Sequence, residues 1–211
     1  MKMEKLKKIW WTLASGYSDN RETIEKLWLE ILAYYSADNR FYHNFRHLAY
    51  MLEKAESYKK GIADFDTFLF SIFYHDIIYD INRQDNEYQS SVKAMECLTK
   101  LGVGQQQISK CMQQILATMD HEKRDDADTD LFTDIDLSIL GEEWSVYEDY
   151  CQKIRQEYNI YPDSVYNAGR IIVLKHFLNM EKIFKTLEFH GSHESRARVN
   201  LQKELDLLIG V

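Results

Sequence analysis

The stretch Phe68-Leu-Phe-Ser-Ile-Phe-Tyr-His-Asp-Ile-Ile-Tyr-Asp80 decides how the rest of the chain is interpreted. Its first seven residues are apolar on almost every side, which is typical of a helix inside a protein and not of one on its surface. His75 and Asp76 interrupt this run at its end. Burying a carboxylate beside an imidazole is costly unless a partner compensates both, and a divalent cation would do so. We therefore expect a metal site at the end of a central helix.

The size and composition of the chain favour one helical domain. Its 211 residues can bury a sizeable core, and one proline and eight glycines are few for a β-rich chain. Apolar residues recur three and four apart, as in Ile24, Leu27, Ile31 and Tyr35, which is the spacing of an amphipathic helix. The prediction is an all-α bundle of about nine helices without strands, with residues 1–211 in a single domain and Met1–Ser18 as its first helix.

The net charge and the cysteine content restrict the classes of binding partner and the cellular compartment that we expect. A formal net charge of -8 argues against a nucleic-acid polymer, because such a partner requires a basic surface. The three cysteines are odd in number and widely spaced, so a reducing cytoplasm is the simplest location. No apolar run approaches the roughly 20 residues that cross a bilayer, so no membrane partner is expected.

His47 is a further candidate ligand. Asn44 is the expected N-cap of a helix whose buried stripe includes Leu48 and Met51. His47 lies one turn before Met51 and should therefore point inward. His43 lies four residues before His47, and the two could chelate one ion from adjacent turns. Alternatively, His43 precedes the helix and contacts the substrate or packs.

Asp136 completes the set of inward-facing candidates. It follows Ile135 and lies four residues after Phe132 in a short predicted helix, so it can share the apolar face. Asp134 is an alternative ligand, but the context Asp136-Leu-Ser-Ile-Leu-Gly141 favours Asp136. Two imidazoles and two carboxylates would hold one ion of Mn, Fe, Co, Ni or Zn, with Mg as a further candidate, and leave positions for water and substrate.

The order His47, His75-Asp76, Asp136 resembles the His…His-Asp…Asp signature of the HD-domain superfamily of metal-dependent phosphohydrolases, an all-α family. A bare His-Asp dipeptide is weak evidence, whereas the ordered quartet is specific. The flanking segments resemble a bacterial branch of predicted HD-superfamily hydrolases: Tyr42-His-Asn-Phe-Arg-His-Leu48, Tyr74-His-Asp-Ile-Ile-Tyr-Asp80, Asn86-Glu87 and Phe132-Thr-Asp-Ile-Asp-Leu-Ser-Ile-Leu-Gly141. The likeness covers residues 20–160, and the helices of residues 162–211 are expected to pack on that core.

The resemblance implies hydrolysis of a small phosphate ester, with nucleotides among the candidates, by attack of a metal-activated water. Some family members carry a Glu three residues beyond the His-Asp pair, where this sequence has Tyr79. The general acid or base could therefore be Asp80, Glu87 or His121. The structural alternatives are a loop carboxylate for Asp80 and stabilisation of a helix N-terminus for Glu87.

Substrate contacts are expected from His43 and Tyr79 and from positive charge at Arg46, Arg83 or Arg170. Arg170 lies in a largely apolar helical segment, where a cation needs an acidic partner. That partner could be Asp163 or another acid, which would give Arg170 a purely structural role.

Two other functions compete with hydrolysis. The resemblance also admits a di-iron oxygenase, but that use of the fold places two further histidines between the His-Asp pair and the last Asp. Only His121 lies in that interval, which favours one metal over two. The third function is a non-catalytic protein that retains the metal for folding and binds a ligand or partner.

Overall fold

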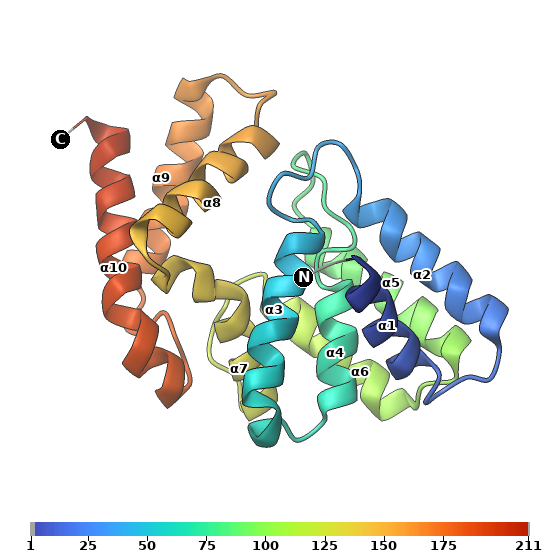
Figure 1. The fold of residues 1–211 in the computed structure, drawn as a ribbon. Coiled ribbons are helices and arrows are strands. Elements are labelled where there is room, and N and C mark those ends of the chain that lie inside the picture. The colour runs from blue at the N-terminus through green and yellow to red at the C-terminus, as the bar shows by residue number, and fades with distance from the viewer. Residues whose placement is uncertain (1–2, 211) are drawn as a thin grey trace. The chain divides into compact units, whose positions relative to one another are not determined.

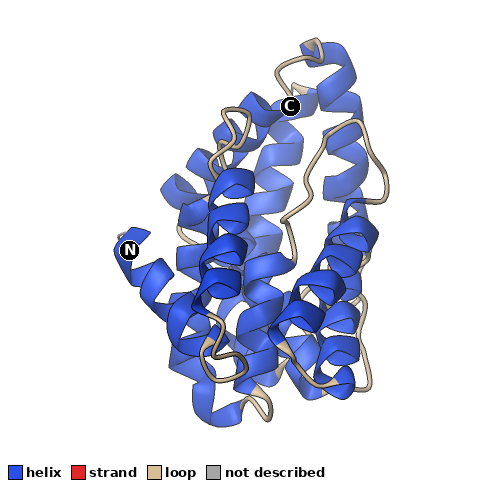
Figure 2. Ribbon diagram, turned by 90° about the vertical axis from the view of Figure 1, so that its right-hand side faces the viewer, coloured by secondary structure: helices blue, strands red, loops and turns tan. Residues whose placement is uncertain are grey.

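The computed structural model describes residues 3–210, in which helices joined by loops are the regular structure and no strand occurs (Figures 1 and 2). The all-α prediction is confirmed, with ten α-helices where about nine were expected. Met1 and Lys2 of the predicted first helix, and Val211, lie outside the described residues. The elements are α1 (Met3–Ala14), α2 (Arg21–Tyr35), α3 (Phe45–Tyr58), η1 (Lys59–Gly61), α4 (Phe65–Tyr74), α5 (Asn86–Leu101), α6 (Gln105–Ala117), α7 (Ala127–Leu137), η2 (Ser138–Gly141), α8 (Trp144–Glu157), α9 (Asp163–Asn179) and α10 (Leu187–Ile209).

Polar side chains set the starts of several helices. The carboxamide oxygen of Asn44 accepts the backbone N–H of Arg46 and caps α3, as predicted. Asp64 accepts the backbone N–H of Thr67 and caps α4. Each such cap satisfies an N–H that the helix itself cannot pair and contributes about 1 kcal/mol. The starts of α3, which carries His47, and of α4, which ends at His75, are therefore set by residues adjacent to them in the sequence.

The described chain forms two compact units, Met1–Thr133 and Asp134–Val211. In the first unit α4 is the central helix: it packs against α3, α5 and α6, and its residues from Thr67 to Tyr74 are all buried. Trp10 of α1 meets Phe73 edge-to-face, with ring centroids 5.4 Å apart. The predicted central helix is confirmed, and it delivers His75 at its C-terminal end.

The second unit contains η2 and α8 to α10, with α10 packed on both α9 and η2. A buried ion pair joins Arg170 of α9 to Glu204 of α10, and the Tyr147 hydroxyl of α8 donates to the same carboxylate. Asn200 donates to the carbonyl oxygens of Leu140 and Glu142. Packing of the helices of residues 162–211 on the core, as part of one domain, stays a prediction.

No helix in the described part of the chain combines the length and apolar character required to cross a membrane.

Candidate metal centre

His75 ends α4 with its imidazole already oriented. Its backbone remains helical and its N–H donates to the carbonyl oxygen of Ser71, so the ring stays on the buried side of α4. The ring Nδ1–H donates to the carbonyl oxygen of Ile72 at 3.0 Å. This hydrogen bond fixes the ring so that Nε2 faces His47 and Asp76, which is the nitrogen that could ligate a metal.

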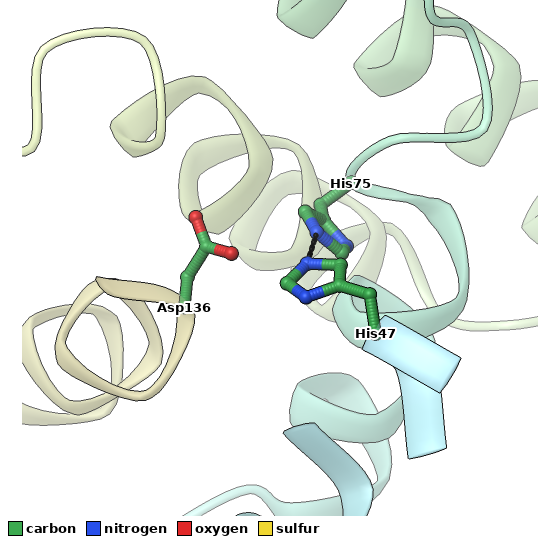
Figure 3. Close-up of side chains that lie close together, drawn as sticks. All are labelled: His47, His75 and Asp136. Atoms are coloured by element: carbon green, nitrogen blue, oxygen red, sulfur yellow. Dashed lines mark hydrogen bonds between the residues drawn. The ribbon is translucent and has the colours of Figure 1, made fainter. Parts of the chain in front are cut away.

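Three donor atoms meet at the end of α4. His47, in the first turn of α3, is buried, and its Nε2 lies 3.0 Å from Nε2 of His75. Oδ2 of Asp76 lies 2.9 Å from Nε2 of His75 and 3.7 Å from Nε2 of His47. Figure 3 shows the two imidazoles side by side, although they belong to different helices. Two ring nitrogens this close require a proton on one of them or a cation between them, because their lone pairs repel.

These separations fit a bound ion. Ligand atoms about 2.1 Å from a metal lie about 3.0 Å apart when they subtend a right angle. The His47–His75 and His75–Asp76 separations match that value, and the longer His47–Asp76 separation corresponds to an angle of about 120°. The three donor atoms are two imidazole nitrogens and one carboxylate oxygen. Such mixed nitrogen and oxygen ligands suit the borderline divalent ions.

The electrostatics keep Asp76 ionised. Burial disfavours the charged form of the carboxyl, but the imidazoles of His75, His43 and His47 favour it more strongly, so the pKa of Asp76 lies below its ordinary value. An ionised carboxylate is the form that binds a cation. The side chain is 20% exposed, so the carboxylate can be reached from solvent.

Asp136 is carried by α7, which begins within the first unit at Ala127. Asp128, in the first turn of α7, accepts the backbone N–H groups of Ala63 and Asp64 and so anchors that end of the helix. Asp136 itself lies just beyond the boundary of the first unit, so its place in the predicted quartet stays a prediction.

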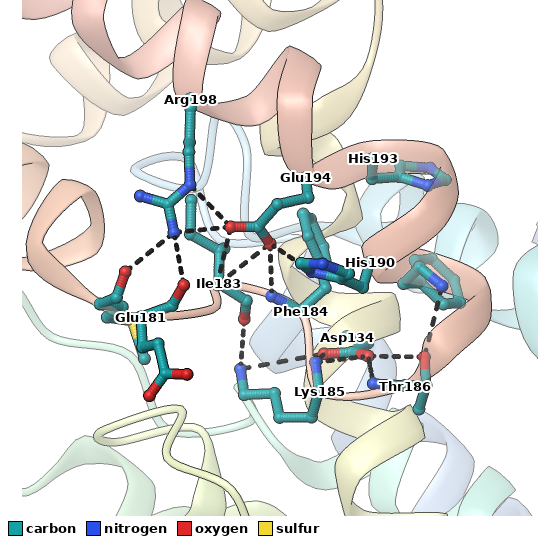
Figure 4. A network of polar contacts seen from close by, with 12 residues as sticks. Asp134, Glu181, Ile183, Phe184, Lys185, Thr186, His190, His193, Glu194 and Arg198 are labelled. Atoms are coloured by element: carbon teal, nitrogen blue, oxygen red, sulfur yellow. Dashed lines mark hydrogen bonds and ion pairs between the residues drawn. The ribbon is translucent and has the colours of Figure 1, made fainter.

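Asp134, the alternative ligand, has a different role. Its buried carboxylate accepts the backbone N–H groups of Lys185 and Thr186 and the Thr186 hydroxyl, at 2.7 to 3.0 Å (Figure 4). Glu194 similarly accepts the N–H groups of Ile183 and Phe184. The two carboxylates fix the segment that leads into α10, so Asp134 has a structural role, and Asp136 as the ligand stays a prediction.

The three acid/base candidates lie in different surroundings. Asp80 is exposed and accepts the backbone N–H and the side-chain amide of Asn82, and these hydrogen bonds lower its pKa. This is the loop carboxylate that the sequence offered as the structural alternative. His121 follows α6 with a left-handed backbone, φ 53°, and its catalytic role stays a prediction. Glu87 is half-buried in the first turn of α5, and its catalytic role stays a prediction.

Among the predicted substrate contacts, His43 and Tyr79 lie beside the ligands. Their rings are tilted by 32° to one another with centroids 4.2 Å apart, and the His43 ring centroid is 5.9 Å from that of His47. Arg46 is exposed in the first turn of α3, and its role stays a prediction.

Two other arginines that the sequence offered as phosphate contacts are held by acids. Arg170 forms a two-point ion pair with Glu204, at 2.7 and 2.9 Å, which supports its structural role and not the predicted phosphate contact. Of the two alternatives that the sequence left open, the partner is another acid and not Asp163, which pairs with Arg155. Arg83 makes a two-point contact with Asp85.

Sequence reasoning missed Arg40, whose buried side chain reaches the turn that contains Asp76. A cation next to the aromatic residues Phe41 and Tyr42 was the local sequence feature that could have pointed to Arg40. Contacts between a guanidinium and backbone carbonyl groups do not depend on residue type, so they leave no pattern in the sequence.

No protein-family model, curated protein or solved structure matches the chain.

Proposed function

We propose that the chain is a metal-dependent phosphohydrolase that cleaves a small phosphate ester, with nucleotides among the candidate substrates, in the cytoplasm. The observation that carries the proposal is the convergence of His47 Nε2, His75 Nε2 and Asp76 Oδ2 within 3.7 Å of one another. The resemblance of the ligand order to the HD-domain superfamily supports the same reaction class.

Different residues would bind the metal, contact the phosphate and transfer the proton. His47, His75 and Asp76, with Asp136, would hold one divalent ion, and a bound ion supplies Lewis acidity toward a phosphoryl oxygen and lowers the pKa of water. His43 and Tyr79 lie beside the ligands, where a ring N–H or a phenol could donate to phosphate oxygens. Glu87, half-buried in the first turn of α5, is a predicted acid or base beside Asp80 and His121.

Metal analysis and a phosphatase screen test the proposal. Purified protein is stripped with a chelator, reloaded with Mn, Co, Ni or Mg, and assayed on p-nitrophenyl phosphate and nucleoside monophosphates. We expect about one ion per chain and turnover that disappears in His75→Gln and Asp76→Asn, because each variant removes one donor from the site. His176→Gln is the matched control, since His176 is exposed on α9.

Three outcomes would contradict the proposal. Turnover that persists in His75→Gln would indicate another centre or a contaminant. Two irons per chain would favour the di-iron oxygenase. Stoichiometric metal without turnover on any phosphoester would favour the non-catalytic, metal-retaining protein.

A further inference from the structure

Arg40 links the two segments that carry the metal ligands. Its side chain is 7% exposed. Nη1 donates to the carbonyl oxygens of His43, at 3.1 Å, and Asp76, at 2.6 Å, and Nη2 donates to that of Ile77, at 2.8 Å. His43 belongs to the segment that leads into α3 and His47, whereas Asp76 and Ile77 form the turn after His75. One guanidinium thus connects both sides of the centre.

The Arg40 guanidinium is surrounded by backbone carbonyl groups and by two tyrosine rings. Its central carbon lies 4.9 Å from the Tyr35 ring centroid and 5.5 Å from that of Tyr79. Within the described part of the chain no carboxylate forms an ion pair with Arg40. The carbonyl groups after α4 lie at the negative end of the helix dipole, which favours a cation there. The contacts of Arg40 therefore fix backbone positions and do not neutralise an acid.

The backbone of Arg40 is also tied to the start of α3. The side-chain amide of Asn44 donates to the carbonyl oxygens of Arg40, at 3.0 Å, and Phe41, at 2.8 Å, while its oxygen caps α3. A continuous path of hydrogen bonds therefore runs from the helix of His47, through Asn44 and Arg40, to the backbone of Asp76.

We propose that Arg40 is a positioning residue for the metal centre. It holds the turn at Asp76 against the start of α3 and thereby sets the separation of the His47 and Asp76 ligand atoms. The inference rests on the metal site of the proposed function. A purely structural role would instead make Arg40 important for folding and irrelevant to metal affinity at equal folded fraction.

Cobalt binding to the full chain separates these roles. Metal-free Arg40→Lys is titrated with Co²⁺ by calorimetry, and the visible absorption of the bound Co²⁺ is recorded, at a temperature where circular dichroism shows a folded protein. Lysine keeps the charge but has one nitrogen, which cannot reproduce the two-nitrogen fork on Asp76 and Ile77. We expect a 10-fold to 100-fold weaker affinity, as for other partners of ligating groups, together with a changed spectrum. Arg21→Lys, at an exposed arginine in the first turn of α2, should bind Co²⁺ as the unmodified chain does.

Asn44→Ser is the second variant. If Arg40→Lys does not fold, Asn44→Ser tests whether this hydrogen-bond path affects metal affinity. Serine can still cap α3 but lacks the amide donor to the carbonyl oxygens of Arg40 and Phe41, so several-fold weaker Co²⁺ binding is expected. Unaltered affinity and spectrum in the folded variants would overturn the inference alone. An unmodified chain that binds no Co²⁺ would overturn both proposals. Co²⁺ binding without phosphatase turnover would overturn only the hydrolase, and the Arg40 comparison would still stand.

Discussion

Gly141 is a position where one added methyl group should destabilise the second unit. A Cβ built on Gly141 would lie 2.5 Å from Cβ of His193 and 2.9 Å from its Cα and carbonyl oxygen. Carbon atoms in contact lie about 3.5 Å apart or more, so α10 would have to move by about 1 Å. Overpacking of this kind costs about 3 kcal/mol, and the lower entropy of the unfolded alanine chain returns about 0.5 to 1 kcal/mol. Gly141→Ala should therefore lower the free energy of unfolding by about 2 kcal/mol.

Urea unfolding followed by circular dichroism measures this change, and Gly169→Ala is the matched control. Gly169 lies inside α9 with nothing within 4 Å of an added Cβ, so alanine should stabilise the protein there by about 0.5 to 1 kcal/mol through helix propensity. Opposite signs for the two variants are the expected result. A Gly141→Ala protein as stable as the unmodified chain would show that the close approach of η2 to α10 does not constrain the fold.

Three further predictions concern the acids and the ion. Asp136→Asn should weaken Co²⁺ binding at least about tenfold with little change in the free energy of unfolding. Asp134→Asn should lower the free energy of unfolding by about 2 kcal/mol and leave the Co²⁺ affinity unchanged. Calorimetry measures the Co²⁺ affinity, and urea titration measures the free energy of unfolding. Burial raises the pKa of Glu204, but the Arg170 guanidinium outweighs burial and holds that pKa below the ordinary 4.5. The stabilisation by the Arg170–Glu204 ion pair is therefore present above pH 4.5 and is lost as the pH falls below that value. Glu204→Gln should be less stable at pH 7 and show a flatter loss in acid, measured by urea unfolding at each pH. Mn²⁺ at 100 times its dissociation constant should raise the unfolding free energy by about 2.7 kcal/mol; a thermal shift that persists in His75→Ala would contradict the site.

The local part of the site could be predicted because helical periodicity assigns faces without knowledge of partners. Asn44 is a cap by residue type, and His47 points inward because Met51, one turn later, belongs to the buried stripe. The apolar run of α4 identified a buried helix with His75 at its end. In each case the signal lies within a few residues of the position concerned.

Contacts between distant segments could not be predicted in this way. Asp134 and Asp136 are two positions apart in one helix, and only the position of Thr186 shows that Asp134 anchors α10. The partner of Arg170 is Glu204 on another helix, where the sequence offered the nearer Asp163. Oppositely charged residues are numerous in this chain, so composition does not choose among them.

The sequence by itself therefore determined the helical class, the buried helix and the residue types of the proposed metal site, since these depend on periodicity and on the chemistry of single side chains. The tertiary structure decided which donor atoms meet, that Arg40 bridges the segments that carry them, and that Gly141 must lack a side chain. Those outcomes depend on distances between segments far apart in the chain, which are set only when the helices pack.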